Sequence, residues 1–263
     1  MIKIAMIGAA GRMGRKILEL LEKDNNFEII GAIDSKNSKL IEQKVFFDSH
    51  ENFVYSYDLE AIIKDIDIAI DFSAANVTIN NLPIFEKYKK ALVIGTTGFD
   101  ELQIKTIENC SKNIPIVLSP NMSIGVNVFF KVLADTTKLL KDYDIEILEI
   151  HHNQKKDSPS GTAMKIGDII LENTKKGKEN LIFGRHGILG ERQKDEIGIH
   201  SVRMGDIVGE HTVYFCGNNE RLEITHKAHS RDNFASGAIR AARWLAEKKQ
   251  NGLYDMFDVL GIK

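Results

Sequence analysis

The turn between the first apolar run and the first helical pattern constrains this chain most. Ile2 to Ile7 has the pattern of a buried strand, and apolar side chains recur at helical spacing over 13–23. Between them lies Gly8-Ala9-Ala10-Gly11-Arg12-Met13-Gly14. Glycines let the backbone turn tightly and approach a pyrophosphate, and the following helix N-terminus offers unpaired N–H groups. The sequence therefore predicts a phosphate-binding turn in a parallel α/β domain.

Asp34 adds a second feature of a dinucleotide site. It ends the apolar run 27–33 and follows Gly14 by about 20 positions, where a carboxylate can bind an adenosine ribose. Asp34 favours the free 2′-hydroxyl of NADH, whereas Lys36 and Lys39 can offset its repulsion of the 2′-phosphate of NADPH. Both cofactors stay open. The spacing G-x-x-G-x-x-G is less specific than G-x-G-x-x-G, so a glycine-rich turn in an ordinary α/β domain is the alternative.

Three further apolar runs, at 66–72, 91–94 and 115–118, continue this pattern. Each is followed by a polar or glycine-containing turn. Ligands of open parallel sheets bind outside the carboxyl ends of the strands, so we expect these turns and the one after Ile7 to line one crevice.

Beyond Asn121 the pattern indicates a second, mixed domain. Apolar and polar residues alternate in its later strands, which predicts a sheet with two different faces. The Lys/Gly-rich stretch 173–196 is expected to form a mobile, solvated loop over this sheet. A last helix is expected to pack on either domain. The predicted elements are a helix at 126–141, a strand at 144–150, a helix at 163–172, strands at 198–203, 211–215 and 221–226, and a helix at 236–250.

The densest group of reactive side chains lies at 149–163, Glu-Ile-His-His-Asn-Gln-Lys-Lys-Asp-Ser-Pro-Ser-Gly-Thr-Ala. If the chain stays extended after Ile150, alternation puts His151 and Lys155 on one face and His152 on the other. Histidine exchanges protons near neutral pH, and a lysine ammonium donates a proton or stabilises negative charge. This spacing predicts a proton-transfer site.

Pro159 is suited to a helix start, so Ser160, Gly161 and Thr162 are expected to open a helix whose free N–H groups hold a substrate carboxylate. The alternative is a histidine pair at a strand end, with Ser160 merely capping the helix. A His-His pair also permits a metal site, but no further His, Cys or carboxylate has a typical zinc spacing. We therefore expect no metal.

Composition argues against several classes of protein. The 35 Lys and Arg against 37 Asp and Glu leave a net charge of −2, which attracts neither nucleic acid nor an anionic membrane surface. No apolar run approaches the ~20 residues of a membrane helix, and the N-terminus lacks the pattern of a secretory signal. Cys110 and Cys216 are too few for a disulfide framework. We expect a cytoplasmic protein.

These segments together resemble the 4-hydroxy-tetrahydrodipicolinate reductase (dihydrodipicolinate reductase) family of the diaminopimelate and lysine pathway. The resemblance covers nearly the whole chain. It implies a Rossmann-like cofactor domain, residues 1–122 with 232–263 returning to it, and a smaller mixed α/β domain, 123–231, that binds substrate and forms a homotetramer. The similar segments are 8–14, 71–73, 94–99, 119–123, 151–162, 203–211 and 225–228.

The resemblance also implies residue roles in an NAD(P)H-dependent reduction. The proton donor/acceptor falls on His151 and the second donor on Lys155, while His152, Gly161 and Thr162 contact a dicarboxylate substrate. The family's basic residue for a 2′-phosphate, directly after the ribose acid, is Ser35 here. The implied dinucleotide-binding residues are Gly8, Ala9, Ala10, Gly11, Arg12, Met13, Asp34, Gly95, Thr96, Thr97, Ser119, Pro120, Asn121 and Met122.

Two other functions fit parts of the sequence. A non-catalytic NAD(P)H sensor would bind the dinucleotide in the first domain and a partner in the second, and it would not need His151 and Lys155 on one face. An aldehyde-type dehydrogenase would need a nucleophilic thiol, but neither Cys110 nor Cys216 has a recognisable nucleophile context.

Overall fold

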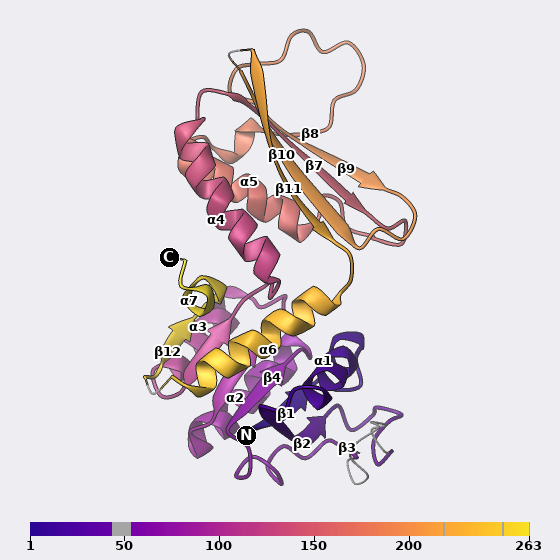
Figure 1. Cartoon of the computed structure of the whole chain (residues 1–263), viewed down its shortest axis with the longest axis vertical. Coiled ribbons are helices and arrows are strands. Elements are labelled where there is room, and N and C mark those ends of the chain that lie inside the picture. Colours follow the sequence, from indigo (N-terminus) through magenta and orange to yellow (C-terminus); the bar gives the residue numbers. More distant parts are fainter. Residues whose placement is uncertain (44–53, 218, 249, 263) are drawn as a thin grey trace. The chain divides into compact units, whose positions relative to one another are not determined.

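A computed structural model describes residues 1–43, 54–217, 219–248 and 250–262 (Figure 1). The chain divides into two compact units. One consists of Met1–Ile124 and Asp232–Lys263, and the other of Gly125–Arg231. Each unit contains its own sheet, so each is described separately.

The first unit contains a seven-stranded sheet in the order β12-β6-β5-β4-β1-β2-β3, and every pairing in it is parallel. The chain order of the strands reverses between β1 and β4, which makes this the switch point where ligands of such sheets bind. The register pairs Ile7 with both Ile33 and Asp71. The turns after β1, β2 and β4 therefore lie together. The strands are β1 (Ile2–Ile7), β2 (Phe27–Ile33), β3 (Tyr55–Ser56), β4 (Ile68–Asp71), β5 (Ala91–Ile94), β6 (Pro115–Leu118) and β12 (Gly252–Tyr254).

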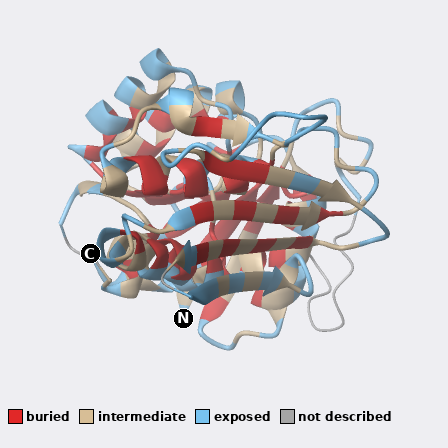
Figure 2. Cartoon of the chain, turned by 90° about the horizontal axis from the view of Figure 1, so that it is seen from above, coloured by how far each residue is buried: buried red, intermediate tan, exposed pale blue. Residues whose placement is uncertain are grey.

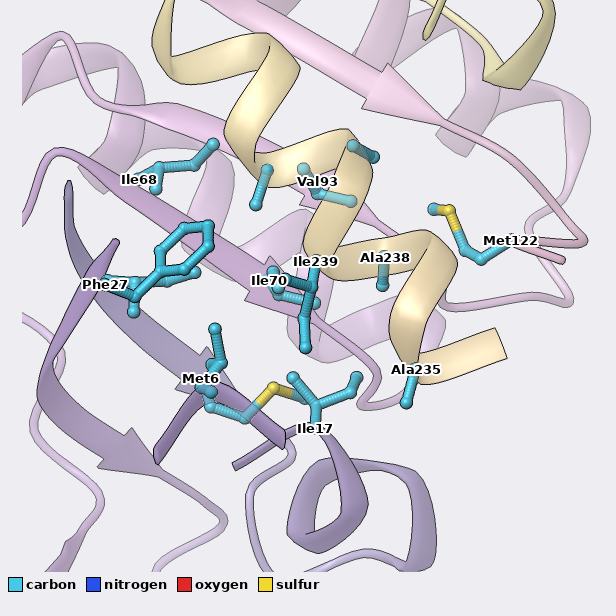
Figure 3. Packing of buried hydrophobic residues seen from close by; sticks show 14 of the residues in the cluster. Met6, Ile17, Phe27, Ile68, Ile70, Val93, Met122, Ala235, Ala238 and Ile239 are labelled. Atoms are coloured by element: carbon cyan, nitrogen blue, oxygen red, sulfur yellow. The ribbon is translucent and has the colours of Figure 1, made fainter. Parts of the chain in front are cut away.

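Helices cover both faces of this sheet. One face packs Met6 and Ile70 against α1 and α6, where Ile17 and Ile239 lie (Figure 3). The other face packs against α2 and α3, which explains why the strands are apolar throughout. The last long helix thus belongs to this unit, where a Cβ on Gly237 would lie 1.7 Å from the Met122 carbonyl oxygen. The helices are α1 (Arg12–Glu22), α2 (Ala75–Tyr88), α3 (Glu101–Ser111), α6 (Asp232–Ala246) and α7 (Met256–Leu260).

The second unit contains a five-stranded mixed sheet in the order β11-β10-β7-β9-β8. Strand β10 is antiparallel to both of its neighbours, whereas β7, β9 and β8 are parallel. Buried and less buried residues alternate along β7 and β10 (Figure 2). Both sheets confirm the predicted fold class, a Rossmann-like unit with a mixed α/β unit. The elements are α4 (Ile124–Leu139), β7 (Asp144–His151), α5 (Gly161–Thr174), the 3-10 helix η1 (Lys178–Asn180), β8 (Leu181–Phe183), β9 (Ile197–Arg203), β10 (Gly209–Gly217) and β11 (Glu220–Ala228).

The expectation of a loop throughout 173–196 was wrong. Residues 178–180 form η1, and the next three form β8, which pairs with β9 at the edge of the sheet. Two arginines of the remaining segment, Arg185 and Arg192, bind Glu146 on β7 at N–O distances of 3.0 Å. A three-residue edge strand depends on its pairing partner and leaves little trace in a charged stretch.

Within the described part of the chain, no helix is long and apolar enough to cross a membrane.

Candidate active site

The glycine turn after β1 has the geometry of a phosphate-binding loop. Gly8 has φ +79, and a Cβ there would lie 2.4 Å from the Phe72 carbonyl oxygen. A Cβ on Gly14 would lie 2.1 Å from the Gly8 oxygen. Gly11 is the N-cap of α1 and offers no side chain to occupy its N–H groups. This turn therefore leaves a backbone cradle at a helix N-terminus, which fits a pyrophosphate.

Asp34 joins the end of β2 to this turn. Its Oδ2 atom accepts a hydrogen bond from the Ala10 N–H at 2.7 Å, and its Oδ1 atom accepts one from the Ser35 N–H at 2.8 Å. Asp34, Gly8 and Gly11 line a cavity of about 510 Å³ that Lys36 also lines, whereas Lys39 does not. The size and donor set of this cavity fit the adenosine end of a dinucleotide. The cavity's other lining residues are Ile7, Ile33, Ser35, Tyr57, Leu59, Phe72, Ser73, Ala74, Val77, Asn80 and Asn81.

Three other expected cofactor residues, Ala9, Arg12 and Met13, lie in the turn after β1 or at the start of α1. Ala9 is buried in the hydrophobic core of the unit. Arg12 and Met13 lie in the first turn of α1, where Arg12 is exposed and Met13 half-buried. Ala9 therefore contributes through its backbone and its packing.

The turns after β5 and β6 lie at the same edge of the sheet but do not line this cavity. A Cβ on Gly95 would lie 2.2 Å from the Phe72 ring. Thr96 is buried, while Thr97 and Pro120 are exposed. The Ser119 hydroxyl donates to the Asn121 carbonyl oxygen at 2.8 Å, and Met122 belongs to the core. Of these seven expected cofactor residues, Thr96, Ser119 and Met122 have buried side chains.

Asp71 connects the turn after β4 to the turn after β5. Its Oδ1 atom accepts hydrogen bonds from the Ser73 N–H at 2.9 Å, the Ser73 hydroxyl at 2.5 Å and the Thr96 hydroxyl at 3.1 Å. Asp71 is fully buried, and this burial raises the pKa of its carboxyl group. Sequence reasoning gave Asp71 no role, although its position at a strand end was the available signal.

In the second unit, strand β7 ends at His151 and the chain turns at once. The Lys155 N–H donates to the His152 carbonyl oxygen at 3.1 Å. The chain is therefore not extended after His151, so the strand alternation that was expected to place His151 and Lys155 on one face does not apply here. His151 is buried on the inner face of β7, and the Lys155 ammonium binds the Asp157 carboxylate at 2.9 Å. His152 is half-buried in the turn.

A buried carboxylate holds the His151 ring. The Glu149 Oε2 atom is 2.5 Å from His151 Nδ1, and the Arg203 guanidinium donates to both Glu149 oxygens at 2.7 and 2.8 Å. Burial by itself raises the pKa of the Glu149 carboxyl, but the hydrogen bonds from His151 and Arg203 outweigh it and hold the pKa well below its usual range. Glu149 is therefore an ionised acceptor next to the histidine.

His211 of β10 packs edge-on against His151, with ring centroids 5.2 Å apart. Its Nε2 atom lies 3.0 Å from the Ser160 hydroxyl oxygen. Burial, and next the nearby His151 charge, lower the pKa of His211 to about 3. A Cβ on Gly209 would lie 2.9 Å from His151 Nε2, so the absence of a side chain there makes room for the ring. Sequence reasoning gave neither His211 nor Gly209 a role.

The N-terminus of α5 joins this group. Ser160 is its N-cap, and the Ser160 hydroxyl accepts a hydrogen bond from the Ala163 N–H at 3.1 Å, which confirms the predicted helix start. Gly161 is exposed, and a Cβ there would meet open space. Thr162 is half-buried in the same turn. The first turn of α5 is thus open to a negatively charged group.

The environment of Cys110 argues against a nucleophilic thiol at that position. Cys110 is buried in the core of the first unit, where burial raises the pKa of its thiol to about 11, so it is no nucleophile. Cys216 is an exposed free thiol near the end of β10. Among the described residues, no three His, Cys, Asp or Glu side chains form a group that could hold a metal.

The first unit has a glycine turn and Asp34 at the switch point of a parallel sheet, and the second unit holds the Glu149–His151 pair. These features define the class of two-unit, dinucleotide-dependent oxidoreductases. Comparison with known sequences gives the family. The sequence models described as "Dihydrodipicolinate reductase, N-terminus" and "Dihydrodipicolinate reductase, C-terminus" match residues 2–122 and 125–260. The chain belongs to the dihydrodipicolinate reductase family.

Relatives and a solved structure agree with this assignment. The 4-hydroxy-tetrahydrodipicolinate reductases of Geotalea uraniireducens and Geobacter sp. are 47% and 46% identical, with all of both chains covered. The dipicolinate-bound dihydrodipicolinate reductase of Paenisporosarcina sp. is 25% identical, with a TM-score of 0.81 over 98% of each chain. A diaminopimelate dehydrogenase of C. glutamicum shares only the fold, with 13% identity and a TM-score of 0.56 over 98% of this chain and 93% of its own.

Proposed function

We propose that the chain reduces 4-hydroxy-tetrahydrodipicolinate to tetrahydrodipicolinate with NADH or NADPH, in diaminopimelate and lysine biosynthesis. Family membership supports the reaction. The observation that carries the residue assignment is the buried His151 ring, held by Glu149 beside the N-terminus of α5. A non-catalytic sensor would have no use for this arrangement.

The cofactor is assigned to the first unit. When bound, the dinucleotide supplies the hydride. The glycine turn binds its pyrophosphate through backbone N–H groups, and Asp34 binds its adenosine ribose. Asp34 favours NADH, whereas Lys36 in the same cavity provides a positive charge for the 2′-phosphate of NADPH. Both are therefore accepted as cofactors.

The substrate is assigned to the second unit. The N-terminus of α5, with Gly161 and Thr162, binds one carboxylate of the dicarboxylate, and His152 contacts it from the preceding turn. Lys155 releases Asp157 to bind the substrate, where its charge stabilises negative charge on the ring nitrogen or a carboxylate.

His151 is assigned the proton transfer. The reaction takes up one hydride and one proton and releases the 4-hydroxyl group as water. Loss of the hydroxyl together with a hydrogen of the neighbouring ring carbon, assisted by Lys155, gives water and a carbon–carbon double bond. The hydride adds to one carbon of this bond, and His151 gives its proton to the other. No metal takes part in this scheme.

We also propose a cytoplasmic homotetramer whose contacts lie in residues 125–231. The edge strands β8 and β11 carry exposed apolar side chains, Phe183 and Leu222, which supports association through this unit. The free thiols of Cys110 and Cys216 suit a reducing compartment. Sedimentation equilibrium of the purified chain tests the tetramer, and a monomeric mass contradicts it.

The activity is tested by the loss of reduced-nicotinamide absorbance. The substrate is made freshly from pyruvate and aspartate semialdehyde by the preceding synthase, and NADH and NADPH are supplied separately. Substrate-dependent oxidation supports the reductase. If both NADH and NADPH bind but neither is oxidised, the reductase activity is contradicted, and the non-catalytic NAD(P)H sensor is the function that remains.

A further inference from the structure

We propose that Glu149 is a positioning residue, which fixes the tautomer of His151 and ties that ring to the substrate-side end of α5. This inference rests on the proposed role of His151. It concerns Glu149, to which the sequence patterns assign no role.

The contacts of Glu149 are divided between its two oxygens. The Oε2 atom binds His151 Nδ1 at 2.5 Å and Arg203 Nη1 at 2.8 Å. The Oε1 atom binds Arg203 Nη2 at 2.7 Å and accepts a hydrogen bond from the Ser160 N–H at 3.1 Å. The Glu149 side chain is fully buried. One carboxylate therefore binds both the His151 ring and Ser160, the N-cap residue of α5.

The charge of Glu149 decides which histidine nitrogen carries the proton. An ionised carboxylate only accepts hydrogen bonds, so the Nδ1 atom of His151 must be the donor in their contact. In the neutral ring the Nε2 atom then has the free lone pair, and in the charged ring it has the transferable proton. Glu149 thus leaves Nε2 as the atom of His151 that exchanges a proton with substrate.

The same carboxylate connects His151 to the proposed carboxylate-binding turn. Ser160 caps α5 through its hydroxyl and also contacts Nε2 of His211, whose ring packs on His151. A change at Glu149 therefore alters proton transfer and the position of the substrate together. The carboxylate acts as a common anchor for both.

Glu146 offers a matched control on the same strand. It lies on the opposite face of β7 and binds Arg185, Arg192 and His200. Burial raises the pKa of Glu146, but hydrogen bonds from Arg185 and His200 lower it to about 2. Glu146→Gln therefore removes an arginine-bound and histidine-bound carboxylate outside the proposed site.

The test compares Glu149→Gln with Glu146→Gln by steady-state kinetics and by ¹⁵N NMR of histidine-labelled protein. We expect Glu149→Gln to lower kcat by about 100-fold, to change the pH profile of kcat and to shift neutral His151 from the Nδ1–H toward the Nε2–H tautomer. The dissociation constant of NADH should not change. Glu146→Gln should leave kcat and the tautomer as in the wild type.

Two results overturn the positioning role. One is the Nε2–H tautomer of His151 in the wild-type protein, a measurement that needs no variant. The other is a Glu149→Gln variant with the kcat and tautomer of Glu146→Gln. If Glu149→Gln does not fold, Glu149→Asp keeps the charge, and it should retain the Nδ1–H tautomer with a lowered kcat. A His151→Gln variant with full turnover contradicts the proposed function instead.

Discussion

Glu149 and His151 lie on the same buried face of β7, and the Glu149 Oε2 atom is 2.5 Å from the His151 Nδ1 atom. Residues two apart on a strand share a face, so this pair is a direct consequence of the strand. A buried carboxylate next to a histidine accepts a hydrogen bond from the ring and so fixes its orientation. The strand therefore places His151 next to a carboxylate that is already ionised.

His151→Gln and Lys155→Ala should lower turnover without weakening the binding of the cofactor. We expect kcat to fall by about 10²- to 10⁴-fold for His151→Gln, the range that general acid–base catalysis contributes. The dissociation constant of NADH, measured by fluorescence titration, should stay within twofold, since the glycine turn lies in the other unit. Lys156→Ala, at the exposed neighbouring position, is the control. Unchanged turnover in both variants would refute the assigned roles.

Lys36→Ala should weaken NADPH binding more than NADH binding. Lys36 lines the cavity with Asp34, and it is exposed, so its charge contributes modestly. We expect about a fivefold rise in the dissociation constant of NADPH and no change for NADH. Lys39→Ala is the matched control, since Lys39 does not line the cavity. If Lys36→Ala changed the dissociation constants of NADPH and NADH equally, Lys36 would not contact the 2′-phosphate.

Gly14→Ala should destabilise the first unit and weaken the binding of both NADH and NADPH. An added Cβ would lie 2.1 Å from the Gly8 oxygen and 2.7 Å from the Ala9 Cα atom, both in the backbone of the turn. We expect a loss of about 2 kcal/mol in the free energy of unfolding. Gly161→Ala is the control, because its Cβ meets open space. Chemical denaturation measures both variants, and equal stabilities would contradict the close packing of the turn.

The stability of the protein should fall in acid partly through His211. The pKa of His211 is lowered to about 3 in the folded chain, whereas an ordinary histidine titrates near pH 6.5. Between these values the unfolded chain binds more protons, so the free energy of unfolding decreases as the pH falls. From pH 6.5 to pH 5 this loss is about 2 kcal/mol.

His211→Gln should flatten this pH dependence. Denaturant unfolding at pH 7, 6 and 5 measures the slope, and His186→Gln at an exposed position serves as the control. A slope equal to that of the wild type would show that His211 is not held neutral by burial.

The sequence predicted central strands that are covered on both faces more accurately than short edge strands. The bounds of β1, β2, β5 and β6 agree with the apolar runs, since parallel strands buried on both faces are apolar throughout. The described strands β3, β8 and β12 have two or three residues each and were not predicted. Such strands form because a neighbouring strand is available, which local patterns do not record.

The site could be predicted in part for similar reasons. His151 and the helix start at Ser160 follow from local patterns, but the turn at His152 breaks the expected alternation. Arg203 contacts Glu149, and His211 contacts Ser160, across about 50 positions of sequence. These contacts form because β9 and β10 both pair with β7. Glu149 itself could have been found, because a glutamate two positions before a histidine on a strand shares its face.

Oxidation of NADH and NADPH by the wild-type chain and by His151→Gln, in the presence of freshly synthesised 4-hydroxy-tetrahydrodipicolinate, tests the central claim most directly. We predict rapid substrate-dependent oxidation by the wild type and a rate at least about 100-fold lower for His151→Gln. Equal rates for the two proteins, or no oxidation by a wild type that binds both cofactors, would contradict the account.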